Sequence, residues 1–355
     1  MKRRSLLFAP LALAAARAAA AADYPAVGAQ APLAFPRDHG SHPDFRTEWW
    51  YITALLQDER GESCGVQITF FRNRPGLAEY GSSAFAPRQL LFAHAAIALA
   101  PRGRLAVDQR AARAGFGLAA ASAATTDVRI GDWSLVLDER GYQARIAARD
   151  FSLALDFTPR QPPFLQGERG VSRKGPHAAQ ASFYYSVPHL ATRGTLTIDG
   201  RERALSGDAW LDHEWSSEYL AAAARGWDWV GLNLDDGGAV MAFRIRDRAG
   251  ATYWAGGALR DAAGTITALA AADVGFTPLA TWRSPRTGIE FPVRMRVRAG
   301  PVDFALDPLF DDQELDARAT VGTVYWEGAV NALRGGARAG RGYLELTGYG
   351  EPLRL

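Results

Sequence analysis

The stretch Val293-Arg294-Met295-Arg296-Val297-Arg298 alternates strictly between apolar and charged residues. Successive side chains of a strand point to opposite faces, so this pattern predicts a strand with one face on a core and the other in water. Shorter runs of the same kind recur along the chain: Val66-Gln67-Ile68-Thr69-Phe70, Trp133-Ser134-Leu135-Val136-Leu137 and Phe151-Ser152-Leu153-Ala154-Leu155. These runs predict an all-β protein.

Turn signals separate the runs at short spacing, as an all-β chain requires. They include Asp58-Glu59-Arg60-Gly61, Asp138-Glu139-Arg140-Gly141, Asp199-Gly200, Asp236-Gly237 and Asp261-Ala262-Ala263-Gly264. Residues 110–124 fit either a short helix or an alanine-rich loop with strands. Residues 159–176 lack strand patterning and are rich in glycine, which favours a loop folded over a barrel mouth.

A loose internal sequence repeat predicts two domains. Residues 48–72 and 227–246 each read as an aromatic strand, an acidic turn with glycine, an apolar strand and an arginine. The repeat predicts a duplicated β unit, in which a tryptophan closes one end of each barrel. We therefore expect two tandem antiparallel β-barrel domains, residues 23–217 and 218–355, with Ser216-Ser217-Glu218 and residues 221–226 as their connection.

The first 22 residues resemble an export signal, with a basic start, an Ala/Leu run and small residues before Asp23. The start Lys2-Arg3-Arg4-Ser5-Leu6-Leu7 resembles a twin-arginine signal, and the general secretion route is the alternative. No other run is long and apolar enough to span a bilayer. The expected location is periplasmic or secreted, and a position peripheral to a membrane is left open.

Removal of the signal changes the charge balance. Four of the 40 Lys and Arg residues leave with it, so that 36 basic residues face 38 acidic ones and the net charge is −2. This balance, with scattered arginines, argues against a nucleic-acid partner. The single cysteine, Cys64, excludes an intrachain disulfide and is expected in a core.

Two segments place ionisable groups among large aromatic rings. They are Glu48-Trp49-Trp50-Tyr51 and Asp212-His213-Glu214-Trp215. Carboxylates and an imidazole beside indole rings are candidates for shifted pKa values and acid–base work, while the rings suit an apolar or cationic guest. On a strand Asp212 and Glu214 point one way and His213 the other, which leaves open which pair faces a cavity. The structural alternative is that the rings fill barrel cores and the charges cap strands.

Other chemistries find little support in the sequence. Adjacent Asp-His-Glu lacks metal-ligand spacing, and the other histidines suggest no second cluster, so neither a metal nor another cofactor is expected. A Gly-x-Ser-x-Gly nucleophile motif and a P-loop are both missing from the sequence. Tyr184 and Tyr185 are candidates for polar groups in an aromatic pocket, or for core rings with bonded hydroxyls.

In combination, these motifs resemble the AttH-like secreted proteins, a family that includes the carotenoid 1,2-hydratases. The resemblance rests on residues 42–51, 167–174 and 183–186, on the tetrad at 212–215, and on Gly226-Trp227-Asp228-Trp229, Tyr325-Trp326-Glu327-Gly328 and residues 342–349. It implies two lipocalin-like barrels in tandem. Members are often described as secreted hydrolases, and some accompany ABC transporter permeases.

The hydratase resemblance implies a mechanism in which an acid protonates an alkene, aromatic faces stabilise the cation, and a base activates water. His213 and Trp215 match the His-x-Trp of the hydratases, with Asp212, Glu214 and Glu48 as candidate acids. Those enzymes also carry Tyr-x-Asp on a later strand, where this chain reads Val240-Met241-Ala242-Phe243. The proton donor is therefore open.

Two functions remain as hypotheses. The first is a hydro-lyase, or a secreted hydrolase, acting on a lipophilic, isoprenoid-like substrate. Its catalytic candidates are His213, Asp212, Glu214 and Glu48, and its candidate ligand-binding residues are Trp215, Trp49, Trp50, Tyr51, Tyr184, Tyr185 and Trp227. The second is a non-catalytic periplasmic carrier that passes a lipid or isoprenoid to an ABC transporter.

Overall fold

The computed structural model describes residues 23–28, 32–76, 83 and 85–353. The predicted export signal lies outside this part of the chain. Within it, the regular structure consists of strands and three short 3-10 helices, Arg37–His39, Ala100–Arg102 and Ala271–Asp273, so the all-β prediction is confirmed. None of the helices in the described ranges has the length and apolar character needed to cross a membrane.

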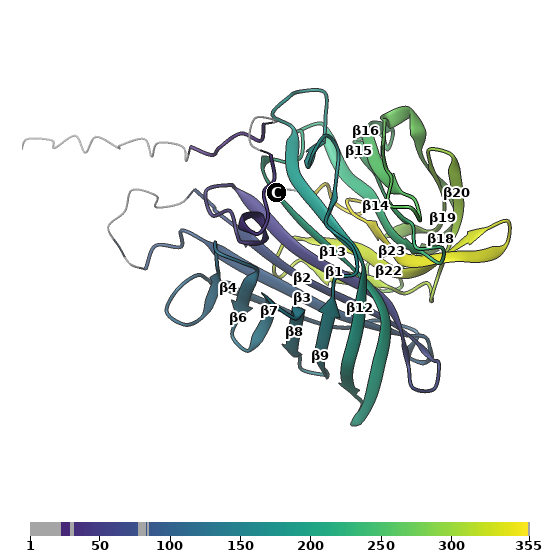
Figure 1. The fold of residues 1–355 in the computed structure, drawn as a ribbon, viewed down its shortest axis with the longest axis horizontal. Coiled ribbons are helices and arrows are strands. Elements are labelled where there is room, and N and C mark those ends of the chain that lie inside the picture. Colours follow the sequence, from purple (N-terminus) through teal and green to yellow (C-terminus); the bar gives the residue numbers. More distant parts are fainter. Residues whose placement is uncertain (1–22, 29–31, 77–82, 84, 354–355) are drawn as a thin grey trace, which may run out of the picture.

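The first half of the chain forms one antiparallel sheet, in the order β4-β3-β2-β1-β13-β12-β9-β8-β7-β6-β5, with β10 and β11 paired to β12 (Figure 1). Its strands are β1 (Thr47–Asp58), β2 (Ser63–Asn73), β3 (Leu90–Leu99), β4 (Ala106–Arg113), β5 (Ala119–Ala121), β6 (Asp127–Ile130), β7 (Trp133–Asp138), β8 (Gly141–Ala147), β9 (Phe151–Thr158), β10 (Phe164–Leu165), β11 (Val171–Arg173), β12 (Ala181–Ile198) and β13 (Arg201–Glu218). The sheet curls until β4 approaches β6, where the Arg110 side chain donates to the carbonyl of Ile130. This curl gives the half a barrel shape around its own core.

The second half forms a separate antiparallel sheet, in the order β17-β16-β15-β14-β23-β22-β20-β19-β18, with β21 paired to β22 (Figure 1). Its strands are β14 (Ala224–Leu234), β15 (Ala239–Asp247), β16 (Thr252–Arg260), β17 (Ile266–Leu269), β18 (Val274–Arg283), β19 (Glu290–Ala299), β20 (Val302–Pro308), β21 (Glu314–Ala317), β22 (Thr323–Arg334) and β23 (Ala337–Leu346). The alternating stretch lies in β19, where Val293, Met295 and Val297 are buried in the core of this half. The alternation therefore has the predicted cause.

The two sheets pack against each other through their outer faces. Side chains of β1, β12 and β13 meet those of β14, β15, β22 and β23 in a third apolar cluster, separate from both barrel cores. Gly65 on β2 permits close contact, because a Cβ there would lie 2.8 Å from the Ala329 Cβ and 2.9 Å from the Tyr343 hydroxyl. Alternate side chains of β1 and β13 therefore pack in the N-terminal barrel core and at the interface between the sheets.

Three expectations about segments need correction. Residues 110–124 contain no helix: β4 ends at Arg113, and β5 follows at Ala119–Ala121. The glycine-rich segment 159–176 includes the short strands β10 and β11, because its backbone pairs with β12. Ser216 to Glu218 still belong to β13 and Ala224 begins β14, so the non-strand connection is residues 219–223.

The internal repeat corresponds to β1–β2 and β14–β15, with an acid and an arginine paired across each hairpin. Glu48 lies opposite Arg72, and Asp228 lies opposite Arg244. The expected role of the tryptophans is wrong for the second copy. Trp227, which opens this copy, packs against the cluster between the sheets and does not close the C-terminal barrel. It lies with Trp229 on the face of β14 opposite to that of Val230, which is in the core of the second half.

Candidate active site

The two aromatic segments lie side by side on adjacent strands. β1 and β13 pair antiparallel, with Trp50 opposite His213 and Tyr51 opposite Asp212. The alternation splits both segments: Trp50 and Trp215 belong to the N-terminal barrel core with His213, whereas Tyr51 packs at the interface. The four catalytic candidates therefore do not form one site.

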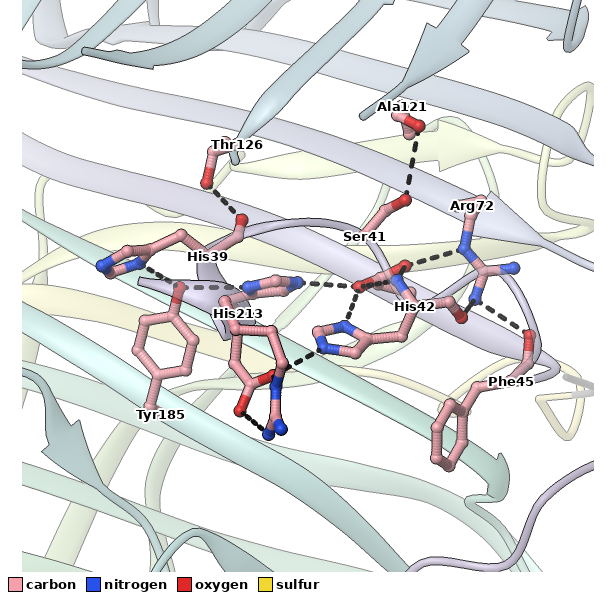
Figure 2. A network of polar contacts seen from close by, with 12 residues as sticks. His39, Ser41, His42, Phe45, Arg72, Ala121, Thr126, Tyr185 and His213 are labelled. Atoms are coloured by element: carbon pink, nitrogen blue, oxygen red, sulfur yellow. Dashed lines mark hydrogen bonds and ion pairs between the residues drawn. The ribbon is translucent and has the colours of Figure 1, made fainter. Parts of the chain in front are cut away.

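The inward pair, Glu48 and His213, belongs to a buried polar network in the N-terminal barrel (Figure 2). The His213 Nε2 lies 2.9 Å from the Glu48 Oε1, and the His42 Nδ1 lies 2.8 Å from the same oxygen. The Arg72 Nε donates to the Glu48 Oε2 over 2.7 Å. On its far side the His213 Nδ1 lies 3.1 Å from the Tyr185 hydroxyl, which also lies 3.1 Å from the His39 Nδ1.

The network has well-defined charges. Burial raises the pKa of Glu48, but the hydrogen bonds from His213 and His42 and the charge of Arg72 outweigh it, so the net pKa is well below the usual range. Burial lowers the pKa of His213 to about 4. For His42, Asp38 and Glu48 outweigh burial and raise the pKa. Glu48 is therefore a carboxylate, and His213 is a neutral ring that donates to it.

His42, Glu48 and His213 place one ligand atom each within 4.8 Å of one another, which is a possible metal grouping. Hydrogen bonds account for this grouping more simply. Both imidazoles meet one carboxylate oxygen, and the Arg72 guanidinium occupies the other. A cation would have to displace imidazole protons beside a buried guanidinium, so these residues do not fit a metal ion.

The outward pair, Asp212 and Glu214, faces a cavity between the two sheets. An inner compartment of about 70 Å³ adjoins an outer one of about 460 Å³, and both are lined by Thr47, Phe71, Trp227, Glu327 and Glu345. The inner compartment is completed by Trp49, Tyr51, Thr69, Tyr184, Asp212, Glu214, Tyr219 and Trp229. The outer compartment is mainly apolar and includes Leu90, Phe92, Val321, Tyr325 and Leu353. We call the two compartments together the interdomain cavity.

The ligand-binding candidates divide in the same way. Trp49, Tyr51, Tyr184 and Trp227 line the interdomain cavity. Trp50, Tyr185 and Trp215 instead pack in the N-terminal barrel core, where the His42 ring stacks on Trp215 at 3.6 Å between centroids. Glu48 and His213 are wholly buried and do not line the cavity.

Asp212 is held by three hydrogen-bond donors. The Tyr184 hydroxyl donates to its Oδ2 over 2.7 Å, and Ser186 and Trp210 donate to its Oδ1 over 2.6 and 2.7 Å. Burial raises the pKa of Asp212 to about 7, and the three donors act against this rise. The Tyr184 oxygen in turn accepts from the Trp229 Nε1 over 3.0 Å, so one hydroxyl joins the C-terminal sheet to Asp212.

Replacing Tyr184 by phenylalanine removes this hydroxyl and leaves the Asp212 Oδ2 and the Trp229 Nε1 each without a partner, while the Asp212 Oδ1 keeps its two donors. We expect the free energy of unfolding to fall by about 1–3 kcal/mol, the usual cost of leaving buried polar groups unpaired. Urea unfolding followed by tryptophan fluorescence measures the change. An unchanged midpoint and slope would contradict the bridging role of the hydroxyl.

Lys174 is a site residue that the sequence did not reveal. It is 1% exposed, and its Nζ lies 2.8 Å from the Glu214 Oε1, which also accepts a hydrogen bond from Ser182. Burial raises the pKa of Glu214, while the charge of Lys174 opposes the rise. Lys174 comes from the glycine-rich segment 159–176, which the sequence predicted as a loop over a barrel mouth.

Glu327 and Glu345 are two further carboxyl groups that were not among the predicted site residues. They lie opposite each other on β22 and β23, and both line the two compartments of the cavity. Burial raises the pKa of Glu345 to about 8, and burial together with Glu345 raises that of Glu327 well above its usual range. Four carboxyl groups therefore face one small aromatic cavity, two from each sheet.

Comparison with known proteins agrees with this architecture. The sequence pattern of the AttH-like family matches residues 26–349. This chain belongs to the AttH-like family. No curated protein matches its sequence.

The AttH-like chain is 50% identical to a solved structure described as an AttH from Nitrosomonas europaea, over 92% of this chain and all of that one, with a TM-score of 0.86. Kievitone hydratase from Nectria haematococca shares the fold at 15% identity, over 92% of this chain and 96% of that one, with a TM-score of 0.68. CghA, solved with Sch210972, shares it at 14% identity, over 87% and 90% of the two chains, with a TM-score of 0.51. The AttH-like protein thus has the two-domain fold of a hydratase.

Proposed function

We propose that this AttH-like protein adds water to a carbon–carbon double bond of an uncharged, isoprenoid-like molecule bound in the interdomain cavity. The observation that carries the proposal is a set of four carboxyl groups among aromatic rings, of which Asp212, Glu214 and Glu327 are buried and Glu345 is partly buried. Burial favours the neutral form of an acid, and a neutral carboxylic acid can protonate an alkene. The faces of Trp49, Trp227 and Trp229 can stabilise the resulting carbocation by about 0.5–2 kcal/mol.

The charges around the cavity argue for an uncharged substrate. The two buried cations beside it, Arg72 and Lys174, are already paired with Glu48 and Glu214. Arg318, which lines the outer compartment, is paired with Asp316. A phosphate or carboxylate inside would therefore meet further carboxyl groups, and every described cation that lines or adjoins the cavity already has an acidic partner. We also propose that the protein acts after export, as the basic start of the chain and its Ala/Leu run indicate.

The carrier remains the second candidate, and one observation favours it. Glu48 and His213, two of the four predicted catalytic groups, lie in a core away from the cavity and not in its wall. The outer compartment is large enough for much of a lipophilic ligand, which an exported carrier could hand to a transporter.

Farnesol, an uncharged isoprenoid alcohol, is a suitable first substrate. We expect it to quench tryptophan emission on binding and to gain the mass of one water during incubation, with heavy-oxygen label entering from labelled water. Farnesyl diphosphate is expected not to bind. Farnesol that binds and stays unchanged would overturn hydration in favour of the carrier, and tighter binding of the diphosphate would overturn the uncharged substrate class.

Replacing Phe71 by tryptophan tests the place of binding, because Phe71 lines both compartments. The larger ring should fill part of the cavity and weaken farnesol binding by about tenfold or more, equivalent to about 1.4 kcal/mol. Phe85→Trp is the matched control, since Phe85 is 72% exposed. Equal affinities of the two variants would place the ligand elsewhere.

A further inference from the structure

The four carboxyl groups of the cavity fall into two classes according to their partners. Asp212 and Glu214, on the N-terminal sheet, are surrounded by donors: three neutral donors for Asp212, and Ser182 with the Lys174 ammonium for Glu214. Donors and a cation stabilise the ionised form of a carboxyl group. The N-terminal sheet therefore presents groups suited to accept a proton.

Glu327 and Glu345, on the C-terminal sheet, have the opposite surroundings. The Glu327 side chain is 95% buried, and its Oε2 has no hydrogen-bond partner. Glu345 receives one neutral donor, the Trp227 Nε1, over 3.0 Å. The two glutamates face each other across paired strands, so ionising both would place like charges side by side in a buried site.

This contrast makes Glu327 the better proton donor of the pair. Its Oε2 is a buried oxygen without a hydrogen-bond partner, at a position that lines both compartments. The Tyr51 hydroxyl lies near Glu327 and is also without a hydrogen-bond partner. The Glu345 oxygen is stabilised as an acceptor by an indole N–H. Glu214 differs again, because Lys174 and Ser182 both contact its Oε1, which leaves the Oε2 for another partner in the inner compartment.

Resting on the proposed hydration, we propose that Glu327 donates the proton and that Glu214, paired with Lys174, activates the water. The Glu327 O–H bond breaks, and its proton forms a C–H bond with one alkene carbon by taking up the π electron pair. The other carbon becomes a cation, to which a water oxygen adds a lone pair. The proton lost by that water passes to the Glu214 carboxylate.

The product carries one more water, and the protein is left with an ionised Glu327 and a protonated Glu214. Proton exchange with solvent in the cavity restores both groups. The donor and the base come from different sheets, so the reaction spans the interface. Lys174 is a positioning residue here: its charge acts on Glu214 and not on the substrate.

Infrared spectroscopy tests the proton assignment without any substrate. A neutral carboxylic acid has a C=O stretch distinct from that of a carboxylate. At neutral pH Glu345 and Asp212 also contribute to this band, so we expect Glu327→Gln to lower its intensity by the share of one carboxyl group. Glu290→Gln, on the exposed surface of the same half, should leave the band unchanged. Glu214→Gln should also leave it, whereas Lys174→Met should add a new one because Glu214 would then hold a proton.

Farnesol hydration tests the roles in turnover. We expect Glu327→Gln and Glu214→Gln to bind farnesol as the wild type does and to lose 10²- to 10⁴-fold in rate, the usual contribution of a general acid or base. The rate should be bell-shaped in pH, with Glu214 on the acid limb and Glu327 on the alkaline limb. Lys174→Met should move only the acid limb, to higher pH.

The outcomes separate this assignment from the proposed function. A Glu327→Gln variant that keeps the full intensity of the neutral carboxyl band, or that hydrates farnesol at the wild-type rate, would overturn the role of Glu327. A shift of the alkaline limb by Lys174→Met would overturn the pairing of roles. If the wild-type protein shows the expected infrared bands but does not hydrate farnesol, the proposed hydration is overturned. The assignment of a neutral Glu327 and an ionised Glu214 would still hold.

Discussion

Replacing Arg72 by methionine is expected to lower the free energy of unfolding by about 3–5 kcal/mol, the usual cost of removing one partner of a buried ion pair. Arg72 is 1% exposed and Glu48 is wholly buried, so the substitution leaves a carboxylate without its main counter-ion. The Arg72 Nη2 also donates to the carbonyls of His42 and Phe45 over 2.9 Å each, and these bonds are lost as well. Urea unfolding of the full chain measures the change.

Two further variants make the expected result specific to the buried pair. Arg72→Met combined with Glu48→Gln should recover much of the loss, because the remaining group is neutral and still accepts from His213. Arg296→Met, which breaks an exposed pair with Asp303, should change stability by no more than about 0.5 kcal/mol. If Arg72→Met costs no more than Arg296→Met, the pair does not hold the N-terminal barrel together.

The second large effect is a fall in stability between pH 6.5 and 8. In this window Glu345, with a folded pKa of about 8 against a usual 4.5, binds a proton in the folded state and none in the unfolded state. An acid whose pKa is raised by folding keeps its proton in the folded state after it has lost it in the unfolded state. The free energy of unfolding therefore falls as pH rises from the unfolded pKa to the folded pKa. The loss is about 1.4 kcal/mol for each pH unit and each group, so Glu345 alone gives about 2 kcal/mol over the window.

Other groups do not reverse this trend in the same window. The lowered pKa of His213, about 4, gives stability that is gained below pH 6.5 and is complete above it. The lowered pKa of Glu48 gives stability that is present throughout. Thermal or urea unfolding at several pH values checks the slope, and Glu327→Gln combined with Glu345→Gln should flatten it. An equally steep fall in that double variant would assign the titration to other residues.

Much of the fold follows from local patterns in the sequence. Alternation predicts the strands, acidic turns with glycine predict the hairpins, and the split of Asp212 and Glu214 from His213 follows from strand geometry alone. The sequence could not say which face of that strand meets a cavity, because both faces are buried, one in the barrel core and one between the sheets.

Two of the missing site residues, Glu327 and Glu345, share one physical cause. Glu327 is the single acid of the mainly apolar β22, and Glu345 is the single acid of β23. Only packing of the sheets brings them to Asp212 and Glu214. A lone glutamate within a largely buried strand such as Thr323–Arg334 is a usable signal, since such a group is costly unless it is neutral or functional. Lys174 and His42 lie outside strands, where periodicity carries no information.

The strict alternation along β13 fixes which side chains face the interdomain cavity and which face the N-terminal barrel core. Inserting one residue just before Asp212 would turn the following side chains over, sending the two acids into the barrel beside Arg72 and the imidazole out toward the indoles of the other sheet. Inserting two residues would return each side chain to its original face, displaced by two positions along the strand. Relatives in which the chemistry persists should therefore vary in length by even numbers within this strand, and odd changes should occur only where a bulge absorbs them.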